Sequence, residues 1–327
     1  SGPTASTSGP PPPPRRQALC GVSRSRWTRI PDFRYSGPVK HPGILNDVLF
    51  RIVFGTQSGE PMLRALVNAL LDLNGDDEIA ELTLVNPISE KEYIDDKGPI
   101  LDLKARDNRG RQYNVEVQLR PGVGDYLKRS IYYLTRFFSE QIQRGDSYHQ
   151  LLKTVSITLL DFNLLEDGEQ VHSTFLLREK TTGLILSDVL ELHYVELRKF
   201  KPSKPAELRT RFEKWLYFLK FADLFGPEDQ ILPENLAQEK GIAMALESMR
   251  RAYAKDPVRE MIEAREKAER DEISRLHTAR LEGKLEGKLE GKLEGKLEMA
   301  RGLLRAGVDR ATILSVSGLS DADLDTL

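Results

Sequence analysis

The pattern that most constrains this fold is the stretch I-L-D-L-K-A-R-D-N-R-G-R-Q-Y-N-V-E-V-Q, which begins at Ile100. Its D-N-R-G segment suits a tight reversal of the chain, so the stretch predicts a β-hairpin. Asp102 and Lys104 are two residues apart on the first strand, and Glu116 and Gln118 are two apart on the second. Side chains two apart on a strand share a face. We therefore expect the hairpin to bring the two acids close together, with the lysine and the glutamine beside them.

The composition of the 327-residue chain allows a sizeable core and excludes several classes of protein. A net charge of -2 shows that the chain as a whole is not a polycation that coats nucleic acid. It does not exclude a basic face on one part of the surface. The single cysteine, Cys20, excludes a disulfide within the chain and a zinc site built from cysteines, and it favours a reducing, cytoplasmic location. The longest apolar runs are far shorter than a membrane span, so we expect no membrane partner.

The first 42 residues predict a disordered extension rather than a domain. They contain a proline run from Pro10 to Pro14 and several arginines, and the first acid is Asp32. An Arg-rich, Ser-rich and acid-poor composition is also typical of organellar transit peptides. The proline run would break the amphipathic helix that a transit peptide needs, so we prefer disorder.

Residues 43–200 have the alternating pattern of a globular α/β domain. A first helix begins with Asn46 or Asp47 as its cap. The patterns that follow predict a helix at 60–73, strands at 82–85, 99–105 and 111–119, a helix at 125–143, and strands at 154–162, 173–177 and 191–197. A hairpin followed by a helical crossover is typical of a mixed sheet covered by helices, and we expect that fold class here.

The chain beyond residue 200 is expected to be helical. Residues 201–280 predict helices, and residues 281–298 contain the unit L-E-G-K four times. A period of four residues rotates the leucine stripe of a helix by about 40° per unit, and each glycine costs roughly 1 kcal/mol relative to alanine. We interpret the repeat as a marginal helical spacer or an oligomerising segment, with disorder as the alternative.

The last segment, residues 299–327, predicts short helices whose pattern resembles a helix-turn-helix. Its final helix is short and acidic, whereas helices that read nucleic acid usually carry basic residues. We therefore expect this segment to serve packing or oligomerisation rather than DNA reading. The C-terminal helices are then the expected contact of a homo-oligomer.

The residue types of the hairpin suit the hydrolysis of a phosphodiester. Two carboxylates can hold a divalent metal that activates a water and neutralises charge on the phosphate. Mg²⁺ prefers oxygen ligands and keeps several waters, so Asp102, Glu116 and the backbone carbonyl of Val117 are a sufficient set. A cation at Lys104 can orient the water or stabilise the charge that develops during the reaction.

The same residues give the chain a resemblance to the PD-(D/E)XK nuclease superfamily. The runs I-L-D-L-K-A-R-D and V-E-V-Q lie between a helix-plus-strand unit and the helix at 125–143. Three further segments resemble, more narrowly, the bacterial Rpn group of recombination-promoting nucleases and transposases: N-D-V-L-F-R-I-V-F-G, R-S-I-Y-Y-L-T-R-F-F-S-E-Q-I and S-I-T-L-L-D-F-N-L-L. The resemblance spans residues 42–200 well and the rest loosely.

This resemblance implies a restriction-endonuclease-like αβββαβ core with a mixed sheet and a helical C-terminal extension, which binds DNA and cuts it with Mg²⁺, or with Mn²⁺ as a substitute. Asp102 then matches the motif aspartate and Glu116 the second metal-binding acid. Gln118 stands where the superfamily has a lysine, and Lys104 could supply the missing charge. Asp47 resembles a further acid of the family, with a helix N-cap as the alternative.

The helix at 125–143 follows the hairpin and carries basic and aromatic side chains. Tyr126, Arg129 and Arg136 suit contacts with the backbone of DNA. The alternative is a partly buried helix whose cations extend to solvent.

Our leading hypothesis is a metal-dependent DNA endonuclease that the resemblance links to recombination or mobile-element activity. The alternative is a catalytically weak or inactive nuclease-fold protein that acts as an oligomeric interaction scaffold, which the glutamine at position 118 motivates. A transposase with three acids on a ribonuclease-H-like sheet is disfavoured, because an acidic hairpin followed by a helix has a different spacing.

Overall fold

The fold is taken from a computed structural model that describes residues 41–87, 103–120, 126–166, 168–226 and 230–327. The chain divides into two units, residues 1–40 and residues 41–327, and the second unit is the one described. The predicted disordered extension lies outside the described residues except for His41 and Pro42, and Asp102 also lies outside them.

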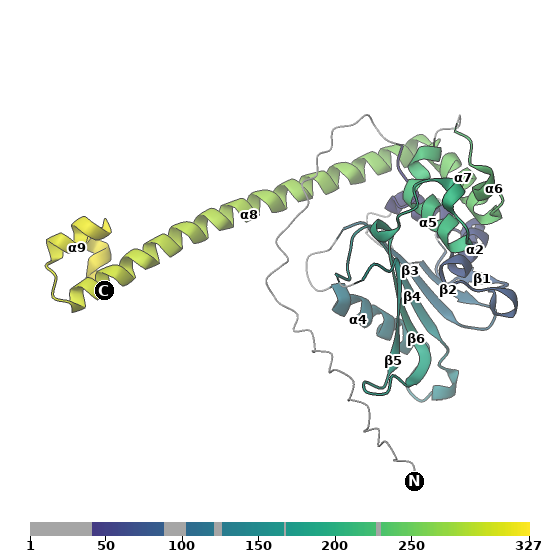
Figure 1. The fold of residues 1–327 in the computed structure, drawn as a ribbon, viewed down its shortest axis with the longest axis horizontal. Coiled ribbons are helices and arrows are strands. Elements are labelled where there is room, and N and C mark those ends of the chain that lie inside the picture. Colours follow the sequence, from purple (N-terminus) through teal and green to yellow (C-terminus); the bar gives the residue numbers. More distant parts are fainter. Residues whose placement is uncertain (1–40, 88–102, 121–125, 167, 227–229) are drawn as a thin grey trace, which may run out of the picture. The chain divides into compact units, whose positions relative to one another are not determined.

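A six-stranded mixed sheet forms the centre of the described unit (Figure 1). Its strands, in chain order, are β1 (Leu82–Leu84), β2 (Leu103–Asp107), β3 (Gln112–Gln118), β4 (Thr154–Leu160), β5 (His172–Arg178) and β6 (Ile185–Glu196). Their spatial order is β1-β2-β3-β4-β6-β5. β3 is parallel to β4 and β4 to β6, whereas the other neighbours are antiparallel. The parallel pairing of β3 with β4 requires the crossover that the sequence predicts.

The two faces of the sheet differ in polarity because side chains alternate along each strand. One face is apolar and includes Val115 and Val117 of β3 beside Ile157 and Leu159 of β4. The other face is also covered but carries polar side chains: Gln112, Asn114, Glu116 and Gln118 on β3, and Thr154, Ser156 and Thr158 on β4. The candidate acid Glu116 thus lies on the polar face.

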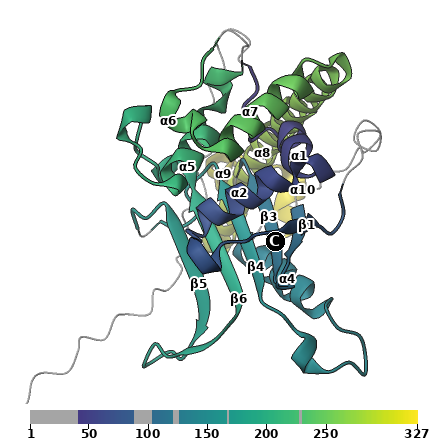
Figure 2. The ribbon, with the colours of Figure 1, turned by 90° about the vertical axis from the view of Figure 1, so that its right-hand side faces the viewer.

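A helical layer packs against the apolar face (Figure 2). It consists of α1 (Asp47–Phe54), α2 (Glu60–Leu70), α5 (Arg211–Phe221) and α7 (Lys240–Tyr253). Of the two predicted caps for α1, the structure has Asn46, whose side chain accepts hydrogen bonds from the backbone N–H groups of Val48 and Leu49. Asp47 is therefore the first residue of the helix, with its carboxylate available for other contacts.

The polar face of the sheet is covered by α4 (Tyr126–Ser139), which contacts β4 and β6. Its buried residues recur every three or four positions, as expected for one face of a helix: Tyr126, Ser130, Leu134 and Phe137. Tyr126 and Leu134 belong to a small core cluster with Leu192 and Tyr194 of β6. The side of α4 that faces the sheet thus combines apolar packing with hydroxyl groups.

The chain after the sheet is helical, as predicted. α6 (Glu234–Ala237) and α7 are followed by α8 (Asp256–Arg305), a continuous helix of 50 residues that includes the whole L-E-G-K repeat. Of the alternatives for the repeat, the structure therefore has the helical one. The repeat leucines Leu281, Leu285, Leu289 and Leu293 are between 46% and 62% exposed, so no other described element covers them.

The C-terminal segment folds back on the end of α8. α9 (Arg310–Ser317) and α10 (Asp321–Asp325) both contact α8. Ala300 of α8 forms a small separate core with Ile313, Leu319 and Leu324. The short helices expected from the sequence are thus present.

The predicted order of a helix, three strands, a helix and a strand is confirmed, and so is the mixed sheet. No helix within the described ranges has both the length and the apolar character that crossing a bilayer needs.

Candidate active site

The predicted hairpin is formed by β2 and β3, and Asp107 shapes its turn. The Asp107 carboxylate accepts hydrogen bonds of 2.9 Å from the backbone N–H groups of Arg109 and Arg111. Gly110 has a φ of 81°, a value that glycine adopts without a steric penalty. The D-N-R-G signal in the sequence therefore marks a real turn.

The register of the hairpin is set by the pairing of Leu103 with Val115. Asp102 precedes the first of these residues in the chain, and Glu116 follows the second. Because Asp102 lies outside the described residues, its predicted closeness to Glu116 stays a prediction.

The carboxylate of Glu116 is buried, with only 8% of the residue exposed. The Gln118 side-chain amide donates a hydrogen bond to its Oε1. The Tyr126 hydroxyl lies 3.3 Å from its Oε2 and also 3.3 Å from Oγ1 of Thr158 on β4. A carboxylate fixed on both oxygens is preorganised, which is the condition that a metal ligand or a general base needs.

Tyr126 acts on Glu116 as a neutral donor. Burial raises the pKa of its phenol above the ordinary value, and the negative charge of Glu116 raises that pKa further. The hydroxyl therefore keeps its proton at physiological pH. Tyr126 is only 7% exposed, so the structure places this predicted DNA contact beneath the surface, directed at the acid.

The backbone at the end of β3 directs one carbonyl away from β4. The carbonyl of Gln118 accepts a hydrogen bond of 3.0 Å from the N–H of Asp161, at the end of β4. Because successive carbonyls of a strand point to opposite sides, the carbonyl of Val117 points toward the β2 side of the sheet. That is the side on which the chain enters β2 at Leu103.

The structure places Lys104 on the same face of the hairpin as Glu116 but pairs its ammonium with another acid. The Lys104 ammonium lies 3.6 Å from the carboxylate of Glu140 and 4.6 Å from the centre of the Phe137 ring. Phe137 lies in the last turn of α4 and Glu140 directly follows the helix, whereas Glu116 contacts Tyr126 at its start. In the register of the hairpin, Lys104 pairs with Asn114, two residues before Glu116 on the same face of β3, and its ammonium is directed toward Glu140. In this arrangement the side chain that donates to the Glu116 carboxylate is Gln118 and not Lys104.

Asp47 forms an ion pair with Arg265 of α8. One helical turn further along α8, Glu269 pairs with Arg120 at 3.0 Å. Arg120 follows β3 by two residues, and side chains four apart on a helix are neighbours. The two pairs therefore link the start of α1 and the segment after β3 to the same face of α8, a link that local sequence signals do not predict.

The predicted DNA-binding cations of α4 lie at its exposed side. The guanidinium of Arg129 is 4.9 Å from the centre of the Tyr126 ring, and Arg136 pairs with Glu140 at 2.8 Å. Tyr132 and Tyr133, between these arginines, are exposed. The helix thus presents cations and aromatic rings together on the side away from the sheet.

Three hydroxyl groups beside Glu116 were missed by the sequence reasoning. Thr158 contacts Tyr126, and Ser130 of α4 lies 2.6 Å from the Tyr194 hydroxyl. For Thr158 the sequence signal is the T-V-S-I-T alternation of β4, which by its apolar residues predicts only a buried strand. Alternating hydroxyls indicate that one face of such a strand meets polar partners.

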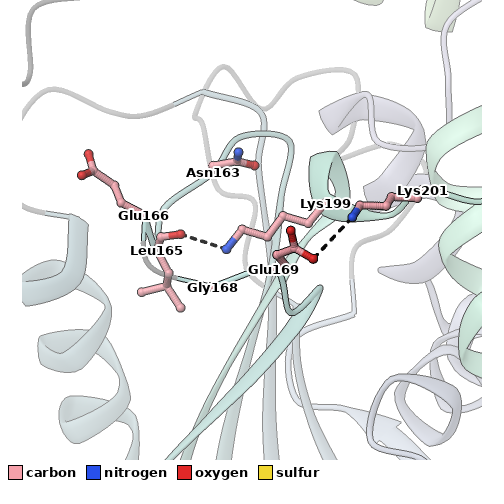
Figure 3. Close-up of a pocket in the computed structure, with 7 residues that line it drawn as sticks. All are labelled: Asn163, Leu165, Glu166, Gly168, Glu169, Lys199 and Lys201. Carbon is pink, nitrogen blue, oxygen red and sulfur yellow. Dashed lines mark hydrogen bonds and ion pairs between the residues drawn. The ribbon is translucent and has the colours of Figure 1, made fainter.

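A separate shallow pocket of about 490 Å³ lies at the loop that follows β4 (Figure 3). The Lys199 ammonium donates to the carbonyl of Leu165 at 2.8 Å and pairs with buried Glu196 at 2.7 Å. Exposed Lys201 pairs with Glu169 at 3.5 Å. These contacts tie the loop to the end of β6, so we assign this pocket a structural role.

The geometry on the polar face agrees with comparisons to known families. Residues 44–279 match the model described as PD-(D/E)XK nuclease family transposase. The chain belongs to this family. Residues 293–327 match the model described as Rpn/YhgA-like nuclease family, C-terminal HTH domain. A search of curated proteins and a search of solved structures each gave no match.

Membership in the PD-(D/E)XK nuclease family transposases confirms the predicted resemblance and assigns the chain a nuclease- or transposase-like function. The second match identifies the C-terminal segment, with α9 and α10, as a helix-turn-helix domain. Such domains are common DNA readers. In this chain Arg310 of α9 pairs with Asp321 and Asp325, so that basic side chain is neutralised within the domain.

The donor atoms at the end of β3 fit a hard divalent cation. Glu116 offers carboxylate oxygens and Val117 a carbonyl oxygen, and Mg²⁺ and Mn²⁺ prefer oxygen ligands of this kind. Among the residues that the structure describes, no three histidine, cysteine or acidic side chains are grouped closely enough to hold a metal. A complete site therefore needs a ligand from the undescribed residues, for which Asp102 is the predicted source.

Proposed function

We propose that this protein is a Mg²⁺-dependent DNA endonuclease, with Mn²⁺ as a substitute, and that it serves recombination or mobile-element activity. The observation that carries this proposal is the buried Glu116 carboxylate, fixed by Gln118 and Tyr126 at the end of β3 in a chain of this family. Buried charges are costly unless they have partners or a function. The burial of Glu116 and its fixed orientation therefore support its proposed role as a metal-binding acid.

In the proposed site, Asp102, Glu116 and the carbonyl of Val117 hold the cation, and Asp47 is an additional acid. The bound cation supplies an activated water and neutralises charge on the scissile phosphate. Tyr126 and Gln118 hold the Glu116 carboxylate in one orientation, so that little reorganisation is needed during the reaction.

Gln118 stands at the position of the superfamily lysine, so this position supplies no positive charge to the site. Its amide can donate a hydrogen bond to Glu116 or to a water but carries no charge. We propose that Lys104, once its contact with Glu140 is broken, or a cation of α4 supplies positive charge near the phosphate. Arg129 and Arg136 are the proposed contacts with the DNA backbone.

The second candidate function is an oligomeric interaction scaffold that keeps the nuclease fold with little or no activity. The observations that favour it are the neutral Gln118 and the uncovered leucines of the repeat on α8. In both readings we propose that the C-terminal helices mediate a homo-oligomer contact. The lone Cys20 supports a cytoplasmic location.

Cleavage of supercoiled plasmid by the purified protein tests the first function. We expect nicking with Mg²⁺ or Mn²⁺, none with EDTA, and a loss of at least about 100-fold in Asp102→Asn and Glu116→Gln, which keep shape but remove charge. Glu166→Gln, an exposed acid beside the pocket of Figure 3, is the matched control and should nick as the unchanged protein does. No nicking in any metal would favour the scaffold.

A further inference from the structure

The start of α8 is built into the fold beside the candidate site. Val258 and Ile262 of α8 are buried in the main core, and this part of the helix contacts α1 and α7 (Figure 2). The same helix face continues with Arg265 and Glu269, because spacings of three and four residues follow one side of a helix. The core-facing stripe therefore ends in two charged residues.

Both of these charged residues bind partners in other elements of the fold. Arg265 pairs with Asp47, the additional acid of the proposed function, and Glu269 pairs with Arg120 beyond the end of β3. The side chains of Asp47 and Arg265 are 26% and 24% exposed, so water screens their attraction only in part. The Glu269 pair is more exposed and should contribute less.

We infer that Arg265 is a positioning residue of the nuclease site, which holds the Asp47 carboxylate and competes for it with a divalent cation. The inference rests on the proposed function in assigning Asp47 to the metal site. A guanidinium and a metal cation cannot both neutralise one carboxylate fully, so removal of the guanidinium charge should tighten metal binding. The helix that carries the repeat and the C-terminal domain thereby sets the metal affinity of the site.

Mn²⁺ binding to the full chain, measured by calorimetry without DNA, tests this inference independently of cleavage. We expect Arg265→Gln to bind Mn²⁺ about 10-fold more tightly than the unchanged protein, because an opposite charge at contact distance shifts a carboxylate's equilibria by about that factor or more. Asp47→Asn should bind Mn²⁺ more weakly than the unchanged protein. Adding Arg265→Gln to Asp47→Asn should not increase its Mn²⁺ affinity. Arg265→Lys, which keeps the charge, should stay close to the unchanged protein.

Glu269→Gln is the matched control, since it breaks the other ion pair on the same helix face. It should leave Mn²⁺ affinity unchanged within about twofold, as expected for a more exposed pair. Thermal melts of each variant identify any that fail to fold, and Arg265→Met, which also removes the charge, replaces Arg265→Gln in the comparison if that variant does not fold. Equal or weaker Mn²⁺ binding by folded Arg265→Gln would overturn the inference, as would a gain of the same size in the Asp47→Asn background.

The plasmid assay keeps the two proposals distinguishable. If Mn²⁺ binds with the expected pattern but no plasmid is nicked, the competition stands and the endonuclease proposal fails. If plasmid is nicked while Asp47→Asn and Arg265→Gln leave Mn²⁺ affinity unchanged, the endonuclease stands and the competition is overturned.

Discussion

One phenol hydroxyl, that of Tyr126, lies between the acid on β3 and a hydroxyl on β4. It joins Glu116 to Thr158 across two parallel strands, while its ring packs 6.4 Å from that of Tyr194. The ring and the hydroxyl therefore have separable effects, one on the packing of α4 and one on the orientation of Glu116.

Tyr126→Phe separates these effects. The substitution keeps the ring but leaves the buried carboxylate with one donor fewer, so we expect plasmid nicking to fall by about 10-fold, as for the loss of a partner that orients a reacting group. The free energy of unfolding should fall by only about 0.5–1.5 kcal/mol, the usual net value of one hydrogen bond. Tyr133→Phe, on the exposed side of the same helix, should change neither quantity.

A second titratable pair lies on the other side of the sheet, where His172 of β5 is 2.9 Å from His193 of β6 and stacks on Phe212. Burial, together with the neighbouring His193, lowers the pKa of His172 to about 4 from its ordinary value of 6.5. Between pH 4 and pH 6.5, His172 therefore binds a proton more readily in the unfolded chain than in the folded protein. Stability from this group is complete above pH 6.5 and is lost as the pH falls toward 4.

His172→Phe tests this dependence while keeping an aromatic ring against Phe212. When the pH falls from 7 to 4.5, we expect the free energy of unfolding of the unchanged protein to decrease by on the order of 1–2 kcal/mol more than that of the variant. This figure is reduced because His172 is partly exposed to solvent. Urea unfolding at the two pH values measures it. Identical pH dependence in both proteins would show that the histidine pair is not responsible.

At the scale of elements, α8 combines a buried start with a repeat that no other described element covers. The glycines of the repeat have open space around them, since a β-carbon placed at any of the four would meet no atom within 4 Å. Gly241 of α7 differs, because its β-carbon would lie 2.5 Å from that of Ala65 and 2.9 Å from the Trp215 ring. The same residue type thus has a packing role in one helix and none in the other.

Alanine at Gly283, Gly287, Gly291 and Gly295 should therefore strengthen the helix. Each substitution is favourable by about 1 kcal/mol of helix propensity, so we expect slower hydrogen exchange and slower proteolysis across residues 281–298, with plasmid nicking unchanged. Gly241→Ala is the control and should destabilise the fold by about 1–3 kcal/mol through overpacking. Unchanged protease sensitivity in the fourfold variant would contradict this account of the repeat.

At the scale of the whole chain, two regions are candidates for the DNA-binding role. One is the exposed side of α4 beside Glu116, and the other is the C-terminal helix-turn-helix domain that the family comparison identifies. The acidic residues of α10 and the internal pairs of Arg310 favour the first. Backbone contacts to DNA depend on cations that reach phosphate, and neutralised cations contribute little.

Paired arginine substitutions decide between these regions. We expect Arg129→Gln with Arg136→Gln to weaken DNA binding and to reduce the slope of log affinity against log salt by about 2, one for each lost phosphate contact. Arg301→Gln with Arg305→Gln, at the end of α8, should have a smaller effect. Fluorescence anisotropy in EDTA measures both without cleavage. A larger loss from the second pair would make the C-terminal domain the DNA reader.

Much of this architecture could be predicted from local sequence signals. The hairpin turn at Gly110, the Asn46 cap and the helix that starts at Tyr126 all depend on neighbouring residues alone. The contacts of the site depend on tertiary pairing instead. The ion pair of Asp47 joins residues that are 218 positions apart, and the turn of Lys104 toward Glu140 follows from how α4 lies on the sheet. No periodicity encodes such contacts.

The unbroken helix through the L-E-G-K units has a consequence for how this chain can change in length. Each unit adds about 6 Å along the helix axis and a net rotation of about 40°. Because the units are identical, gaining or losing one leaves the sequence on both sides of the repeat unaltered. The helix can therefore be lengthened or shortened by whole units, and the sequences of the nuclease core and of the C-terminal domain need not change.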